Sequence, residues 1–279
     1  MSRPAADEGG GKADFSSVYT LPDPRGLVAA LRPLEYAVPH LARPVVQREL
    51  AGRTDRPVLD VCCSYGINAA GLRCGVDVAE LAVRYDDPAL AALDPDALTA
   101  ADAAFYAART VAPEVEVLGL DASAPAVDYA VAAGLHAGGW AEDLESAPPS
   151  DALTAGIADV GTVVCTGGVG YVGERTFARL LDVLDPTDLR VVLVVLRVFD
   201  IGPIADVLAG HGLVTERLPG TLRQRRFADA AEQAAAEDAV RARGQDPGGR
   251  ETEGWYHADC YVSRPAGVAG RPPSRNEAG

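Results

Sequence analysis

The sequence predicts an α/β fold, built around a doubly wound and mostly parallel β-sheet with helices on both faces. Short apolar segments, such as residues 57–63 and 190–200, have the length and composition of strands that are buried on both faces. Segments with helical periodicity follow these strands, and the alternation recurs along the chain. Ligands of such sheets bind at the carboxyl ends of the strands. The residues that follow each strand therefore form the candidate site.

The segment before the first strand is predicted to be helical and to end near Gly52. We expect Pro33, Pro39 and Pro44 to break it into separate helices. The first strand–turn–helix unit then begins at Pro57, with PVLDVCC as the strand and INAAGLRCG as the returning helix.

A long helical stretch, residues 76–112, separates this unit from the second strand. Pro88 and the Asp94-Pro95 pair are expected to break it. We expect this insertion to pack beside the ligand site as a cap. The alternative is a surface elaboration that makes no ligand contact.

Further strands are predicted in the second half of the chain, at residues 115–123, 158–168, 190–200 and 256–264. The arginines of TLRQRRFADA alternate as on a solvated strand face, with carboxylate binding as the alternative role. The following AEQAAAEDAVRARG is expected to be an exposed helix.

A single domain is predicted over residues 18–264, with residues 18–52 as an N-terminal helical lid and residues 76–112 as the insertion. Polar, glycine-rich composition predicts disordered tails at residues 1–17 and 265–279.

Composition favours a small-molecule ligand. The net charge of −15 repels nucleic acids and anionic membrane surfaces, so neither is an expected partner. No apolar segment approaches the roughly 20 residues that span a bilayer, and the first residues lack the apolar core of a signal peptide. We expect a cytoplasmic protein, and a homodimer is left open.

The cysteines and histidines do not predict a metal site. Five cysteines without a secretory signal argue against a disulfide framework. Adjacent residues on an extended segment point to opposite faces, so Cys62 and Cys63 cannot easily grip one ion together. The four histidines are scattered, and no metal-binding spacing occurs. The cysteines are expected to behave as small apolar residues.

The turn CCSYGIN, residues 62–68, follows the first strand and is expected to face the ligand. Gly66 allows a close approach of the backbone, and the next helix offers free N–H groups. Cys62 and Ser64 are small enough to replace glycine, provided that their φ angles stay negative. Tyr65 and Asn68 add polar side chains.

Three separated segments resemble the class I S-adenosylmethionine-dependent methyltransferases. VLDVCCSYG resembles the motif that wraps the methionine part of the cofactor, although Cys62 and Ser64 replace two glycines. VLGLDAS resembles the second motif, in which Asp121 would bind both ribose hydroxyls. GGWAEDLES resembles the third, in which Asp143 would reach the adenine amino group, and CTGGVGY occupies the fourth position.

This resemblance implies a Rossmann-like methyltransferase fold, S-adenosyl-L-methionine as cofactor and methyl transfer to a small molecule. The residues that it assigns to the cofactor are Asp60, Cys62, Cys63, Ser64, Tyr65, Gly66, Asn68, Asp121, Ala122, Ala141, Glu142, Asp143, Thr166 and Gly167.

Catalytic candidates are Tyr171 after the fourth strand, and Tyr36 and His40 before the domain. No recognisable base dyad is present, and methyl transfer requires mainly alignment of the nucleophile and exclusion of water.

Three alternatives remain at this point. An NAD site would prefer GxGxxG with an acid about 20 residues further on, which the sequence lacks. The loss of two glycines leaves open a cofactor-binding protein without activity. The third is an enzyme that closes the cofactor's own amino acid part into a small ring, similar to an azetidine-2-carboxylate synthase, and releases methylthioadenosine.

Overall fold

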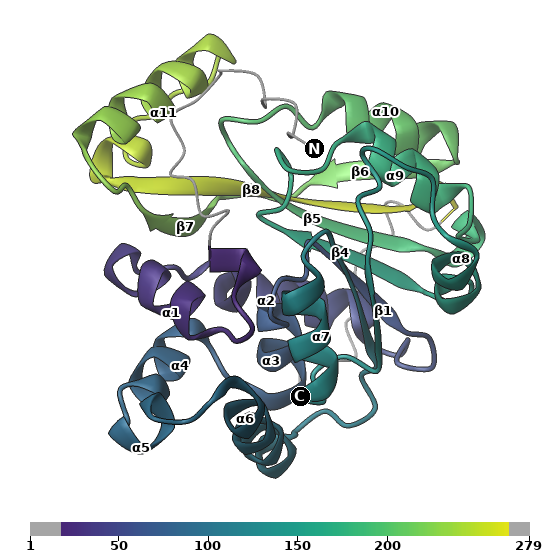
Figure 1. Cartoon of the computed structure of the whole chain (residues 1–279). Coiled ribbons are helices and arrows are strands. Elements are labelled where there is room, and N and C mark those ends of the chain that lie inside the picture. Colours follow the sequence, from purple (N-terminus) through teal and green to yellow (C-terminus); the bar gives the residue numbers. More distant parts are fainter. Residues whose placement is uncertain (1–17, 268–279) are drawn as a thin grey trace, which may run out of the picture.

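The structure is a computed structural model that describes residues 18–267 (Figure 1). The tail predicted at residues 1–17 and most of the tail predicted at 265–279 lie outside the described residues. The last strand includes Pro265, the first residue that we had assigned to the C-terminal tail.

The strands are β1 (Val58–Val61), β2 (Val117–Asp121), β3 (Gly138–Ala141), β4 (Thr162–Thr166), β5 (Arg190–Leu196), β6 (Leu213–Arg217), β7 (Leu222–Arg226) and β8 (Trp255–Pro265). The helices are α1 (Arg25–Leu31), α2 (Val38–Leu50), α3 (Ile67–Cys74), α4 (Val78–Tyr85), α5 (Pro88–Ala91), α6 (Pro95–Arg109), α7 (Ala124–Ala132), α8 (Asp151–Ile157), α9 (Glu174–Leu181), α10 (Gly202–Gly210) and α11 (Ala230–Ala242). Short 3₁₀ turns are η1 (Val18–Thr20), η2 (Arg32–Leu34), η3 (Pro186–Asp188) and η4 (Glu251–Glu253).

The strands form one 8-stranded sheet in the order β3-β2-β1-β4-β5-β8-β6, and β7 pairs with β8. The five strands from β3 to β5 are mutually parallel. β8 runs antiparallel to β5, β6 and β7. The predicted doubly wound, mostly parallel sheet is therefore confirmed. The strand order reverses between β1 and β4, which is where such sheets bind ligands.

Two hydrophobic layers cover the faces of the sheet, because successive strand residues point to opposite sides. Val58 and Val117 pack in one layer with residues of α2, α3 and α7. Their neighbours Leu59 and Leu118 pack in the other layer with residues of α8, α9 and α10. The parallel strands are thus apolar on both sides, as their sequences predict.

The N-terminal segment is divided into the separate helices α1 and α2 as predicted, but only two of the three prolines lie at the division. Pro33 lies in η2 and Pro39 lies in the first turn of α2, where proline is tolerated. Pro44 lies inside α2 and does not divide it. α2 ends at Leu50, and Gly52 follows with a φ of +70°.

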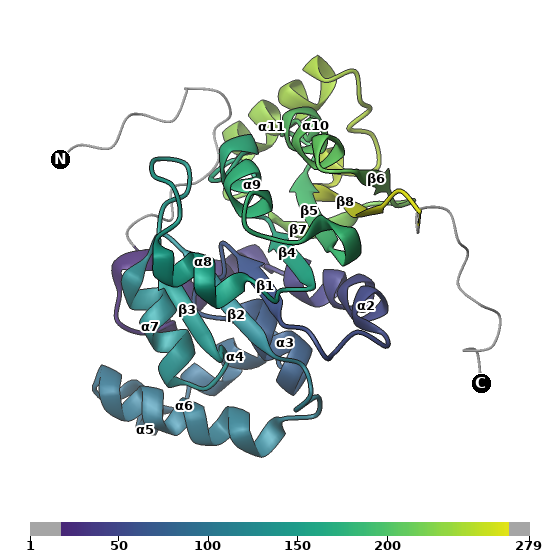
Figure 2. The same cartoon turned by 90° about the vertical axis from the view of Figure 1, so that its right-hand side faces the viewer.

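The insertion forms α4, α5 and α6, and Figures 1 and 2 show these helices at the end of the molecule opposite α11. Pro88 and Pro95 each occupy the first turn of a helix, so they start helices at the predicted breaks. Arg25 of α1 donates to the main-chain oxygens of Leu90, Ala91 and Leu93. The insertion therefore packs against the N-terminal helices.

Of the arginines in TLRQRRFADA, Arg223 and Arg226 are exposed as predicted, but Arg225 is not. Arg225 is buried and donates to both carboxylate oxygens of Glu232, at 2.9 and 2.6 Å. Glu232 also accepts the N–H of Ala228 at 2.7 Å. The helix after β7, α11, buries Glu232, Ala236 and Val240, so the expectation of an exposed helix was wrong. Strand periodicity alone could not reveal this pairing, because the partner comes from the next helix.

Candidate functional site

A cavity of about 510 Å³ opens at the carboxyl ends of the parallel strands. Its walls are the turn after β1, the residues after β2, β3 and β4, the N-terminal segment and β7. This volume lies in the range of small-molecule sites, and the position is the topological switch point.

The turn after β1 has an unusual backbone. Cys62 and Ser64 adopt left-handed conformations, with φ of +59° and +50°. The condition under which the two residues were expected to replace glycine, a negative φ, is therefore not met. Both residues take a left-handed conformation that glycine adopts readily, at a cost in strain for non-glycine residues. Gly66 has a φ of +79°, and a Cβ there would approach Leu135 Cδ1 to 2.9 Å.

Asp121 ends β2 and connects this turn to the next one. Its Oδ2 accepts the backbone N–H of Ser64 at 2.9 Å, and its Oδ1 accepts that of Ser123 at 2.9 Å. Burial raises the pKa of Asp121, while these backbone hydrogen bonds oppose the rise. Each carboxylate oxygen has a second acceptor position, so the group retains capacity for a ligand in the cavity.

The turn after β3 brings Glu142 and Asp143 to the cavity wall. Glu142 accepts hydrogen bonds from the N–H and hydroxyl of Ser150, at 2.9 and 2.5 Å. Asp143 accepts the N–H of Glu145 at 3.0 Å. These short contacts fix the two acidic side chains where β3 ends.

Asp60 lies in the middle strand beneath the cavity. It is buried, and Asn68 Nδ2 donates to its Oδ1 at 2.8 Å. Its Oδ2 has no hydrogen-bond partner among residues 18–267. Burial raises the pKa of Asp60 to about 7, the Asn68 hydrogen bond opposes the rise and the charge of Asp121 adds to it.

The N-terminal segment forms one wall of the cavity through residues such as Tyr19, Leu27 and Tyr36. The Tyr65 hydroxyl lies 2.7 Å from the main-chain oxygen of Val18 and 2.8 Å from that of Leu21, and donates to this segment. Ser123 Oγ donates to the main-chain oxygen of Tyr19. The turns after β1 and β2 therefore hold η1 in place.

Tyr19, Tyr36 and Tyr171 all line the cavity. Burial raises the pKa of Tyr19 and of Tyr36, and the nearby charge of Asp60 raises the pKa of Tyr36 further. Both phenols are therefore neutral hydrogen-bonding groups near neutral pH.

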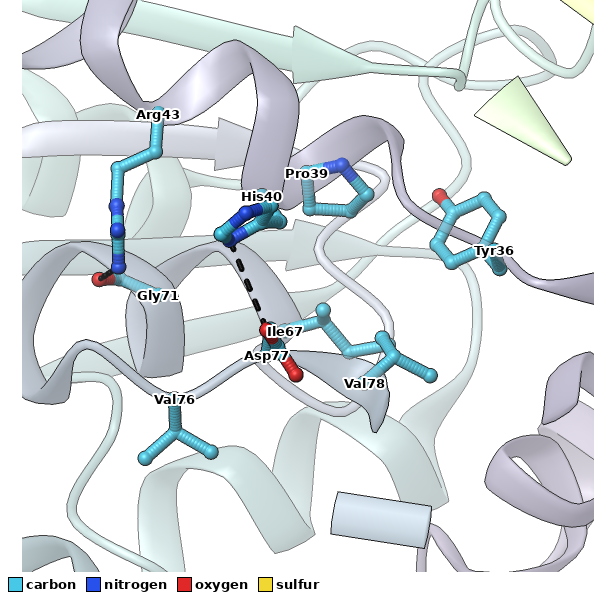
Figure 3. Close-up of a pocket in the computed structure, with 9 residues that line it drawn as sticks. All are labelled: Tyr36, Pro39, His40, Arg43, Ile67, Gly71, Val76, Asp77 and Val78. Carbon is cyan, nitrogen blue, oxygen red and sulfur yellow. Dashed lines mark hydrogen bonds and ion pairs between the residues drawn. The ribbon is translucent and has the colours of Figure 1, made fainter. Parts of the chain in front are cut away.

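His40 lies outside this cavity. It belongs to a separate pocket of about 10 Å³, between α2 and the start of α4 (Figure 3). Its Nδ1 lies 3.7 Å from Asp77 Oδ2, the contact drawn as a dashed line in Figure 3. That volume holds about one water molecule, so the pocket is too small for a substrate.

The structure brings most of the predicted site residues to one place. The predicted residues that line the cavity are Tyr36, Cys62, Cys63, Ser64, Asn68, Asp121, Ala122, Glu142, Asp143, Thr166, Gly167 and Tyr171. Four predicted cofactor residues do not line it, namely Asp60, Tyr65, Gly66 and Ala141. Tyr65 instead supports the N-terminal segment, and Gly66 packs against Leu135.

The insertion contributes no residue to the cavity wall within the described chain. The expectation that the insertion lies beside the ligand site as a cap was therefore wrong, and the insertion packs against the N-terminal helices instead. Its polar centre is Asp102, a fully buried carboxylate that accepts hydrogen bonds from Arg84, Tyr85 and Tyr129. The Tyr129 ring also meets the Tyr65 ring edge-on, with centroids 5.8 Å apart.

Sequence reasoning missed Gln224, which lines the cavity from β7. Its neighbours are arginines, so periodicity assigned the whole segment to solvent. All five cysteines are free thiols, of which four are buried and Cys62 is half-buried at the cavity wall. No group of three metal-ligating side chains occurs within residues 18–267. Within the same range, no helix is long and apolar enough to cross a membrane.

No family model and no curated protein matches this sequence. Among solved structures, the chain is similar to a TehB-like SAM-dependent methyltransferase from Corynebacterium glutamicum, with 15% identity over 81% of this chain and 99% of the other, and a TM-score of 0.38. It is similar to magnesium protoporphyrin IX methyltransferase from Synechocystis with bound SAM, with 13% identity, 92% and 86% coverage, and a TM-score of 0.39. It is also similar to geranyl diphosphate C-methyltransferase from Streptomyces coelicolor, with 11% identity, 94% and 88% coverage, and a TM-score of 0.42.

Proposed function

We propose that this protein is an S-adenosylmethionine-dependent methyltransferase that acts on a small molecule. The observation that carries the proposal is the position of Asp121, a carboxylate at the end of β2 that lines the cavity next to the turn after β1. A carboxylate there can accept both hydroxyls of a ribose.

The residues present fit this cofactor. Ser64 Oγ and Thr166 Oγ1 belong to cavity-lining residues and have no hydrogen-bond partner among the described residues. Buried polar atoms without partners are rare unless a ligand or water satisfies them. In the proposed complex, the turn at residues 62–68 holds the methionine part, Asp121 holds the ribose and Asp143 reaches the adenine.

Charge favours this cofactor over a phosphorylated one. Asp121, Glu142 and Asp143 line the cavity, whereas Arg225 is the single cationic side chain among its described lining residues. Arg225 is already paired with Glu232. A dinucleotide would bring its phosphates into this negative field, while S-adenosylmethionine has no phosphate and carries a positive sulfonium.

S-Adenosylmethionine supplies a methyl group that its sulfonium already activates. The protein's task is then to align an acceptor and exclude water. Tyr36 and Tyr171 are the residues that we assign to this task, as neutral side chains that orient the acceptor. His40 has no part in the proposal because it lies in the pocket of Figure 3.

Binding and product analysis test the proposal. Calorimetry with S-adenosylhomocysteine should give one site per chain, and absence of binding would reject the cofactor. Incubation with S-adenosylmethionine and a small-molecule extract should release S-adenosylhomocysteine only when extract is present. Release of methylthioadenosine from cofactor alone would instead identify closure of the cofactor's amino acid part into a ring.

A further inference from the structure

Gln224 occupies an irregular position in β7. The pairing of β7 with β8 shifts register between Arg223 and Arg225, so Gln224 is the extra residue of a bulge. Bulges next to binding sites turn one side chain out of the regular alternation. Here the consequence is that both Gln224 and Arg225 are buried and line the cavity.

The Gln224 amide lies against the carboxyl end of β4. A Cβ placed on Gly167 would come within 2.8 Å of Gln224 Nε2 and 3.8 Å of the Tyr36 hydroxyl. Gly167 also has a φ of +73°. A glycine is therefore required at this point, because it leaves room for the amide and the phenol beside the strand end.

Polar atoms at this end of the cavity have unused hydrogen-bonding capacity. Gln224 Oε1 and Thr166 Oγ1 are buried without a hydrogen-bond partner in the described part of the chain. The main chain of Gln224, in contrast, accepts the N–H of Ala37 at 2.8 Å and so fixes β7 against the segment that carries Tyr36. A buried amide held in this way would lose free energy unless a ligand group completed its hydrogen bonds.

No described lining residue at this end of the cavity offers an unpaired charge, and Asp60, whose charge acts on Tyr36, does not line the cavity. Arg225 and Glu232 neutralise one another through two hydrogen bonds. Tyr36 is a neutral phenol, and amides and threonine hydroxyls are uncharged. An ionised group placed here would lose its hydration without gaining a counter-charge.

We infer that Thr166, Gln224 and Tyr36 form the acceptor subsite, and that it recognises an uncharged group that both donates and accepts hydrogen bonds, such as a primary amide or a hydroxyl. This inference rests on the proposed function, because it assigns the acceptor end of the same cavity. A site built on hydrogen bonds discriminates against analogues that cannot complete them. The apolar side chains of Leu27 and Leu31 line the same cavity and suit a hydrocarbon or aromatic body.

Three probes of one shape test the subsite: benzamide, benzoate and benzylamine, each added to the protein saturated with S-adenosylhomocysteine. Ligand-observed NMR should show benzamide binding at least about tenfold more tightly than either charged probe. Equal binding of benzoate, or no binding of benzamide, would overturn the inference. Failure of S-adenosylhomocysteine to bind would instead reject the proposed function, so the two failures are distinguishable.

Two variants locate the effect. Gln224→Leu should lower the affinity for benzamide at least about tenfold. It should leave the affinity for S-adenosylhomocysteine within about threefold of the wild-type value. Gln224→Glu should reverse the preference toward benzylamine, because it adds a carboxylate of the same shape. Gln47→Leu, at an exposed position of α2, is the matched control and should change neither. Unchanged preference in both Gln224 variants would place the acceptor elsewhere.

Discussion

Asp121 Oδ2 accepts the backbone N–H of Ser64 at 2.9 Å, although Asp121 ends β2 and Ser64 follows β1. Ser64 is held in a left-handed conformation at this point. The carboxylate that we assign to the ribose therefore also shapes the turn assigned to the methionine part. Binding and loop geometry depend on the same side chain.

Asp121→Asn should lower the affinity for S-adenosylhomocysteine by about 100-fold, because a charged acceptor of two hydroxyl hydrogen bonds is lost. The amide keeps the shape but only one acceptor oxygen, so it can accept only one of the two backbone N–H groups, of Ser64 and Ser123, and part of the loss comes from the turn itself. Isothermal titration calorimetry measures the effect. Asp128→Asn, at an exposed position of α7, is the control and should bind as the wild type does. Wild-type affinity in Asp121→Asn would remove Asp121 from the site.

Ser64→Gly should raise the free energy of unfolding by about 1 kcal/mol. The change removes a left-handed non-glycine residue and a buried hydroxyl without a partner among residues 18–267, and both gains exceed the entropy cost of glycine. Ser64→Val should destabilise, since a β-branched residue tolerates this conformation poorly. Urea unfolding of the two variants compares them. A less stable glycine variant would mean that the hydroxyl has a structural role.

The raised pKa of Asp60 predicts how the free energy of unfolding of the ligand-free protein varies with pH. This pKa rises from 3.8 to about 7 on folding, so between these values the folded state holds a proton that the unfolded state has lost. Stability therefore falls as pH rises through this window. Asp60→Asn should reduce this decline, to which Asp121 and Glu251 also contribute through their raised pKa values, and should be more stable than the wild type at pH 8 by on the order of 2–4 kcal/mol. Thermal unfolding at pH 5 and pH 8 measures the stability of both proteins. An equal loss of stability between the two pH values in wild type and variant would contradict the prediction.

Tyr65→Phe should loosen the N-terminal segment, which we propose acts as a lid. The hydroxyl lies within hydrogen-bond distance of two main-chain oxygens of this segment, at 2.7 and 2.8 Å. Loss of the hydroxyl should speed amide hydrogen exchange at residues 18–24. It should also lower the affinity for S-adenosylhomocysteine about threefold to tenfold. Tyr261→Phe, in β8, provides the control. Unchanged exchange and affinity would mean that the segment stays closed without this contact.

The sheet could be predicted because its strands are short apolar segments separated by helices. The position of Asp121 followed from the same pattern, since residues at the ends of parallel strands meet at one edge. Asp143 was assigned only by the resemblance to a methyltransferase motif, because the short strand β3 before it was not predicted. The left-handed Cys62 and Ser64 could not be predicted in this way. Residue type favours negative φ for both, and only the surrounding contacts impose the other conformation.

Features that depend on contacts between segments far apart in the sequence also could not be predicted. The bulge at Gln224 exists only because β7 pairs with β8, and the burial of Arg225 requires Glu232 from the following helix. The helices in residues 76–112 could be predicted, but the surface against which they pack could not. Their attachment to α1 depends on the contacts of Arg25 with three main-chain oxygens of the insertion.

The place of β8 in the sheet has a consequence for synthesis. β8 is the last strand in the chain, yet it lies between β5 and β6 and is the partner of β7. While the ribosome is still making residues 227–254, the strands β1 to β5 can already pair, whereas β7 has no strand to join. Asp121 and its turn can thus be assembled during translation, but Gln224 reaches its position only after residues 255–265 emerge. If the proposed sites are right, we expect a nascent chain stalled before Trp255 to bind the cofactor without selecting an acceptor.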